Sequence, residues 1–276
     1  VPEFLNKRDS FLFKMYQAFG HHFDFIAIPI IKKRLRMDTS QVIINEERPQ
    51  LTKHLATRFK EKIGQNVNLL GEVVLGNGEA DHRYHHYLEA LESPDINYIS
   101  VKISGIYAQT HALNYEESFP ELVSRMSALY QKAIDFPYTD EDGIKRSKFI
   151  NLDMEEYKDA HFTLRLFKAV LNLPQFKNYS AGIVVQAYLP DAYDFQTELL
   201  EFAKARVDGG GAPIKMRLVK GCNLEMETVI SSLKGWPNPI RPSKTEVDAN
   251  YLCLLERGLM PENARVLHLG VASHNL

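Results

Sequence analysis

The stretch IKMRLVKGC, residues 214–222, reads as a strand that ends at a glycine. Ile214, Met216 and Leu218 suit a strand that has a buried face. Arg217 and Lys220 do not, because a buried cation without a partner is among the costliest groups to place inside a fold. The stretch therefore predicts a strand whose two cations either reach solvent or lie beside an anionic group.

Short apolar runs of the same kind alternate with amphipathic segments after residue 64. This alternation predicts six strand–helix units around a parallel sheet, and a chain of 276 residues has the size of one (β/α)8 barrel. The first sixty residues carry apolar residues at three- and four-residue spacings and are predicted to be helical. We expect an N-terminal helical arm over 1–62 and a barrel over 63–276. The expected strands lie within residues 66–75, 97–107, 148–157, 181–189, 214–222 and 266–275.

The composition is that of a globular domain in a reducing compartment. The formal net charge is −2, so no global field favours nucleic acid or an acidic membrane. The only cysteines, Cys222 and Cys253, form neither a disulfide framework nor a metal-thiolate set. No apolar run reaches the roughly 18 residues of a membrane-spanning helix. We expect a cytoplasmic protein.

The expected strands each carry a polar residue near the carboxyl end. In parallel α/β folds, ligands bind at that edge of the sheet. Gly221 would let the backbone approach a ligand closely, and Lys244, just before a helix, would add positive charge. A phosphate-bearing cofactor fits such a ring, although no G-x-G-x-x-G or Walker loop is present. The polar residues are Glu72, Lys102, Asp153, Gln186, Arg217 with Lys220, and His274 with Asn275.

Two rival kinds of site use other residues. Glu72, Asp153 and Glu155 contain a candidate glycosidase acid pair, which the surrounding cations and amides fit less well. His82 and His86 have the i, i+4 spacing of some metal ligands. They lack the glutamate of an H-E-x-x-H motif and lie on a helix expected to face solvent. We therefore predict a solvated helix face there and no metal site.

Seven motifs resemble, in order and spacing, the proline dehydrogenase domain of the proline utilization A family. The motifs are VNLLGE (67–72), ISVKIS (99–104), INLDMEE (150–156), IVVQAY (183–188), MRLVKG (216–221), TEVDANY (245–251) and VASHN (271–275). The resemblance implies a distorted (β/α)8 TIM-like barrel that holds FAD non-covalently. It implies oxidation of L-proline to 1-pyrroline-5-carboxylate, by hydride transfer from proline C5 to flavin N5, as the first step of proline catabolism to glutamate. It also implies a quinone as the electron acceptor, a fused pyrroline-5-carboxylate dehydrogenase, and peripheral contact of the protein with a membrane.

The resemblance assigns roles to individual residues. Arg217 matches the arginine that contacts the flavin near N5 and O4, where a cation stabilises the negative charge of the reduced ring. Lys102 matches the active-site lysine near the substrate, and Asp153 matches an aspartate that supports the site. These three are the expected catalytic residues. The positions expected to bind the cofactor are Asp153, Val184, Gln186, Arg217, Lys220, Gly221, Cys222, Lys244, His274 and Asn275.

Part of the family pattern has no counterpart in the sequence. The family barrel has eight strands and a final helix with a pair of arginines that clamp the proline carboxylate. The chain contains six such units and no such arginine pair, so we expect it to be a barrel truncated at its C-terminus. Two alternatives stay open: a flavin-binding or catalytically incomplete module, and another flavin barrel such as a methylenetetrahydrofolate reductase-like enzyme.

Overall fold

The computed structural model divides into two compact units, Val1–Glu61 and Lys62–Leu276. In the first unit, helix α2 spans Asp24–Thr39 and helix α3 spans Arg48–Lys60. The expectation of an N-terminal helical arm over 1–62 stays a prediction. The structure describes residues 10, 11, 14, 17, 24–39, 44, 48–69, 74, 76–108, 110 and 112–272.

The second unit is built on a six-stranded sheet in which every neighbouring pair is parallel. The strand order is β1-β2-β5-β6-β7-β8, so the strands lie side by side in chain order and the six expected strands are confirmed. A second, two-stranded antiparallel hairpin of β3 and β4 was not predicted. The strands are β1 (Val67–Asn68), β2 (Tyr98–Lys102), β3 (Tyr138–Thr139), β4 (Lys145–Arg146), β5 (Phe149–Asp153), β6 (Gly182–Gln186), β7 (Ile214–Val219) and β8 (Leu267–Val271).

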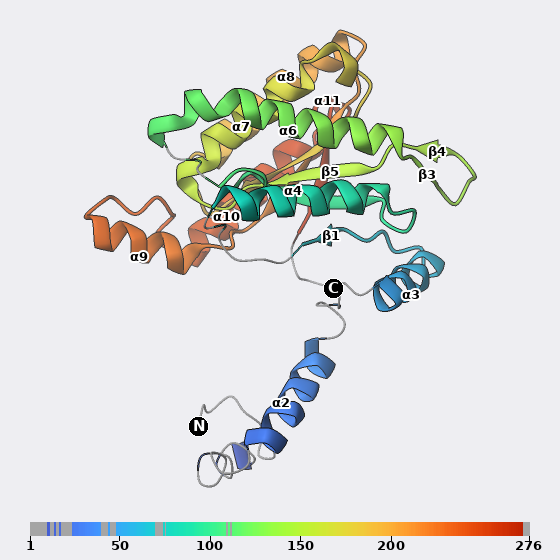
Figure 1. Ribbon diagram of the computed structural model, residues 1–276. Coiled ribbons are helices and arrows are strands. Elements are labelled where there is room, and N and C mark those ends of the chain that lie inside the picture. The colour runs from blue at the N-terminus through green and yellow to red at the C-terminus, as the bar shows by residue number, and fades with distance from the viewer. Residues whose placement is uncertain are drawn as a thin grey trace. The chain divides into compact units, whose positions relative to one another are not determined.

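Helices follow the strands of the main sheet, as Figure 1 shows. Helices α4, α6, α8 and α10 pack against β2, β5, β6 and β7 respectively. This strand–helix succession is that of a distorted (β/α) barrel, as expected. The helices of this unit are α4 (Asn77–Glu92), α5 (Ile103–Ile106), α6 (Tyr115–Asp135), α7 (Tyr157–Leu171), α8 (Ala192–Asp208), α9 (Leu224–Lys234), α10 (Lys244–Leu259) and α11 (Pro261–Ala264), with 3-10 turns at Ala112–Asn114 and Pro174–Phe176.

One face of the sheet is apolar and packs against these helices. Alternate residues of each strand point to the same face, because the side-chain period of a strand is two. On this face the side chains are almost fully buried, and α6 meets them with an apolar stripe of Leu122, Met126 and Leu129. The strand residues on this face include Ile99, Val101, Ile150, Leu152, Ile183, Val185, Met216 and Leu218.

The opposite face of the sheet is polar. Register pairs Lys102 with Asp153 and Arg217 with Val184, so these side chains share one face. Ser100, Asn151, Gln186 and Lys215 lie on it as well by strand alternation. Arg217 lies two residues before the end of β7, beside Val184, which agrees with the expected place near the carboxyl end of the strand. Polar residues therefore occur along this face, interspersed with Tyr98, Phe149 and Val184, and are not confined to the strand ends.

Candidate functional site

The centre of the polar face is an ion pair between two strands that are not neighbours in the sheet. Arg217 Nη2 lies 2.6 Å from Asp153 Oδ1, and Arg217 Nη1 donates to Ser100 Oγ over 3.3 Å. Asn151 Nδ2 donates to the same Asp153 oxygen over 2.7 Å. Of the two outcomes predicted for Arg217, solvent or an anionic group, the structure shows the second, with the Asp153 carboxylate as the anionic group.

The Asp153 carboxylate is held in a buried position. The residue is 8% exposed, and burial raises the pKa of its carboxyl above the ordinary value. Arg217, Asn151 and Ser100 oppose that shift of the pKa through charge and hydrogen bonds. The guanidinium thus compensates for the burial of the carboxylate, and in return the carboxylate fixes the direction of the guanidinium.

A second group of contacts surrounds Glu155, two residues after the end of β5. Lys102 Nζ lies 2.5 Å from Glu155 Oε1, and Ser104 Oγ donates to Glu155 Oε2 over 3.0 Å. The main-chain carbonyl of Glu155 accepts from Gln186 Nε2 over 3.0 Å. The other end of that amide, Gln186 Oε1, accepts from the backbone N–H of Cys222 over 3.4 Å. Because Lys102 and Asp153 are register partners, this group adjoins the Arg217 ion pair.

A third group lies between the end of β7 and the start of α10. The Asp248 carboxylate pairs with Lys220 Nζ at 2.6 Å and with Lys244 Nζ at 2.5 Å. Both lysines hold the pKa of Asp248 below its ordinary value. Ser243 is the N-cap of α10, with its Oγ accepting from the backbone N–H of Glu246, so Lys244 occupies the first helical position and Asp248 follows one turn later.

The backbone conformation of the residue after Lys220 requires a glycine. Gly221 has φ of +148°, and a Cβ at this position would overlap the ring of Tyr188. Tyr188 donates its backbone N–H to the carbonyl of Lys220 over 2.7 Å, which holds the two segments together. Because Val219 pairs in register with Gln186, the turn leaves the sheet beside that amide. Val184 shares the polar face next to Arg217.

The structure brings most of the predicted residues together on or beside one face. Glu72, His274 and Asn275 lie outside the described residues, so their placement stays a prediction. Three partners of the predicted residues were not predicted from the sequence: Ser100, Asn151 and Asp248. Two-residue spacing from Lys102 and Asp153 could have identified the first two, since both precede a predicted site residue by two positions in a strand. The i, i+4 spacing from Lys244 could have identified Asp248.

The structure gives little support to a glycosidase acid pair or to a metal site at the histidines. Asp153 and Glu155 each form an ion pair with a cation. Two carboxylates that are held in this way are poorly suited to act as the acid and base on either side of a glycosidic bond. The rings of His82 and His86 lie 4.2 Å apart between centroids. Among the residues that the structure describes, no group of three or more His, Cys, Asp or Glu side chains could hold a metal ion. Within the same residues, no helix is both long and apolar enough to cross a membrane.

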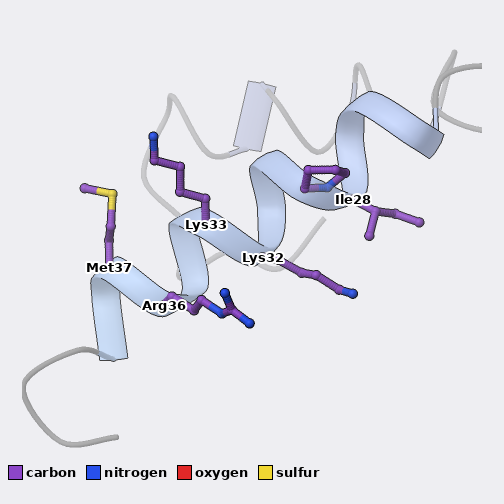
Figure 2. A pocket seen from close by; sticks show the side chains of 6 residues that line it. Ile28, Lys32, Lys33, Arg36 and Met37 are labelled. Carbon is purple, nitrogen blue, oxygen red and sulfur yellow. The ribbon is translucent and has the colours of Figure 1, made fainter. Parts of the chain in front are cut away.

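A hollow with a volume of about 730 Å³ lies along α2 in the first unit. Figure 2 shows that its labelled side chains leave the helix in different directions and do not converge on one point. It contains none of the predicted site residues. A ligand site needs convergent polar groups, so this hollow is not a candidate. Its lining is Ile28, Pro29, Lys32, Lys33, Arg36 and Met37.

Comparison with known proteins identifies one matching family model and several similar solved structures. The family model described as proline dehydrogenase matches residues 51–276. Proline Utilization A (PutA) from Corynebacterium freiburgense is 38% identical, with a TM-score of 0.80 over 100% of this chain and 27% of its own. PutA from Bdellovibrio bacteriovorus, in a structure inactivated by N-propargylglycine, is 31% identical, with a TM-score of 0.69 over 82% of this chain and 24% of its own.

PutA from Bradyrhizobium japonicum, at 24% identity and a TM-score of 0.64 over 76% of this chain and 21% of its own, is alike in fold. No curated protein matches the chain. The chain spans about a quarter of the length of the solved proteins that it matches, at 27% and 24% for the first two. With the family model matched over residues 51–276 and a relative 38% identical along the full chain, this chain belongs to the proline dehydrogenase family.

Proposed function

We propose that this chain binds FAD on the polar face of its sheet and uses it to oxidise L-proline to 1-pyrroline-5-carboxylate. The observation that carries the proposal is the Arg217 guanidinium, which Asp153 holds at 2.6 Å in the middle of that face. Family membership supports proline as the substrate and argues against a methylenetetrahydrofolate reductase-like enzyme.

The donor set of the face fits FAD. Lys220 and Lys244 lie together around Asp248 and would hold the anionic diphosphate. The amide of Gln186 and the guanidinium of Arg217 would hold the electron-rich heteroatoms of the flavin ring. Gly221 has no Cβ, so the turn after β7 would let the cofactor approach the backbone. The proposed cofactor site also includes Asp153, Val184, Cys222, His274 and Asn275.

Each charged residue of the face has a proposed task in the reaction. When bound, a flavin would supply an acceptor at N5 for the hydride from proline C5 and a route for the electron pair to a quinone. Arg217 stabilises the negative charge that develops beside it, and its fixed position means that little reorganisation is needed during the reaction. Asp153 keeps the guanidinium in that position. Lys102 attracts the carboxylate of proline as a point charge.

The wider setting follows from the relatives and is proposed with the activity. The reaction would be the first step of proline catabolism to glutamate. A fused pyrroline-5-carboxylate dehydrogenase would take the product, as the resemblance implies, and the matched PutA proteins are long enough to hold such a further domain. We propose that the protein is cytoplasmic and makes peripheral contact with the membrane that holds the quinone. We also propose that residues 1–62 form an N-terminal helical arm and residues 63–276 the barrel.

Anaerobic mixing of the purified full-length protein with substrate tests the proposal. We expect L-proline to bleach the visible absorbance of bound flavin, and D-proline or methylenetetrahydrofolate to leave it unchanged. Bound flavin that L-proline does not bleach would identify a catalytically incomplete flavin module instead. Protein that purifies and refolds without flavin would refute the cofactor assignment.

A further inference from the structure

We propose that Glu155 is a positioning residue that sets the substrate side of the site through its carboxylate and the cofactor side through its main-chain carbonyl. The inference rests on the proposed function and deepens it. Glu155 belongs to no strand or helix, yet its two polar groups contact residues from different strands.

The Glu155 carboxylate is itself held in place, and it forms an ion pair with Lys102. Its Oε1 atom lies 2.5 Å from Lys102 Nζ, whereas its Oε2 atom accepts from Ser104 Oγ over 3.0 Å. With both oxygens engaged, the carboxylate has one preferred orientation. The side chains of Lys102 and Glu155 are 26% and 34% exposed, so their ion pair lies at the edge of the site and a ligand can reach it.

The main-chain carbonyl of the same residue holds Gln186. It accepts from Gln186 Nε2 over 3.0 Å, which leaves Gln186 Oε1 facing the backbone N–H of Cys222 at 3.4 Å. This contact also fixes which end of the Gln186 amide faces which neighbour. A change of the Glu155 side chain removes the contact with Lys102 but keeps the carbonyl that orients Gln186, so the two tasks can be separated by mutation.

The geometry favours positioning of Lys102 over competition with a ligand. An ammonium group has three N–H donors, and the contact with Glu155 Oε1 occupies one of them. The remaining donors are available to the carboxylate of a substrate. Lysine has a long flexible stem, and holding it in place before binding removes part of the entropic cost of binding. Loss of the Glu155 charge should therefore weaken substrate binding more than it slows the chemical step.

Steady-state kinetics of the full-length flavoprotein carrying Glu155→Gln test the proposal. We expect KM for L-proline to rise about tenfold, equivalent to about 1.4 kcal/mol, while kcat changes by less than about twofold. Flavin content and the visible flavin spectrum should not change, because the carbonyl that holds Gln186 remains. The matched control is Glu156→Gln: this neighbouring carboxylate pairs with Lys158 at 2.8 Å, outside the site, and should leave KM unchanged.

Two further variants separate positioning from a structural role. In a Lys102→Met background, adding Glu155→Gln should change KM by less than about twofold, because the contact that it serves is already gone. Ser104→Ala removes the second anchor of the carboxylate and should raise KM by about twofold to fourfold even if Glu155→Gln folds poorly.

Three results would overturn the inference. A lowered KM in Glu155→Gln would mean that the carboxylate competes with substrate for Lys102. An unchanged KM would mean that Lys102 needs no such anchor. Parallel loss of flavin and of kcat would mean that Glu155 supports the fold alone. Absence of proline oxidation in the unsubstituted protein would instead refute the proposed function, so the two failures are distinguishable.

Discussion

Replacing Arg217 with methionine should slow hydride transfer to the flavin more than it weakens proline binding. The guanidinium gains interaction energy as negative charge develops beside it, and a contact that strengthens toward the transition state appears in the rate constant. Loss of one fixed charged donor of this kind costs about 2–4 kcal/mol, or about two to three orders of magnitude in rate. The fixed position of the donor comes from the 2.6 Å contact with Asp153.

The same substitution also has a structural cost, which must be separated from the effect on rate. Arg217→Met leaves the 8%-exposed Asp153 without its cation. Breaking a fully buried pair costs about 3–5 kcal/mol, and the 24% exposure of the Arg217 side chain lowers the expected loss of unfolding free energy to about 2–3 kcal/mol. The double variant Arg217→Met with Asp153→Asn removes the unpaired charge. It should recover part of the stability and none of the rate.

Stopped-flow reduction of the flavin in the full-length protein measures the rate, and urea unfolding followed by flavin release measures the stability. Lys215→Met is a matched control. Lys215 lies on the same strand and face, and its Nζ lies 5.6 Å and 5.5 Å from the ring centroids of Tyr98 and Phe149, away from the Asp153 pair. A reduction rate near that of the unsubstituted protein, with only a raised half-saturation for proline, would refute the role of Arg217.

Three further predictions concern the cofactor turn and the stability of the barrel. Lys220→Met should weaken FAD binding about threefold to tenfold and flatten its salt dependence, because one of the two lysines around Asp248 is lost; a salt dependence equal to that of the unsubstituted protein in an FAD titration would contradict this. Gly221→Ala should lower the unfolding free energy by about 1–3 kcal/mol in urea unfolding, since the new Cβ overlaps Tyr188 at a φ of +148°; an unchanged midpoint would be the contrary result. Burial lowers the pKa of Lys148 to about 8, against an opposing attraction from Asp95. Between about pH 8 and 10.5 the unfolded state therefore binds more protons than the folded state, and the unfolding free energy should rise with pH by about 1–3 kcal/mol relative to Lys148→Met. Parallel pH profiles of unfolding free energy for the two proteins would refute the shift.

The sheet could be predicted from the sequence because its strands are buried on one face and follow one another in space. Apolar runs bounded by polar turns identify such strands, and short βα connections place them in chain order. The β3–β4 hairpin could not be predicted in this way. Its strands are two residues long and lack an apolar pattern, and its turn depends on Asp140 accepting from the backbone N–H groups of Asp142 and Ile144.

The sequence predicts which residues form the candidate site, but not which of them pair with one another. Polarity in an apolar strand identifies Lys102, Asp153 and Arg217, since each needs a partner. Which partner it receives depends on register and on loop conformation. The pairing of Arg217 with Asp153 bridges β7 and β5 across β6, and no local pattern in the sequence encodes that distance. For the same reason the sequence offered Glu155 as a member of a glycosidase acid pair, whereas in the structure its carboxylate forms an ion pair with Lys102.

The pairing of cations with carboxylates explains how the polar face can fold and still bind anions. Within the described residues, Lys102, Arg217, Lys220 and Lys244 all contact a carboxylate, and three carboxylates serve these four cations, leaving one positive charge in excess. Lys102 and Arg217, whose side chains are 26% and 24% exposed, would be costly to leave unpaired beside an apolar core, whereas Lys220 and Lys244, at 42% and 83%, are largely solvated. The carboxylates engage only part of the donors, because lysine carries three N–H groups and arginine five. An anion that binds the donors left over would add to the ion pairs and would not need to break them.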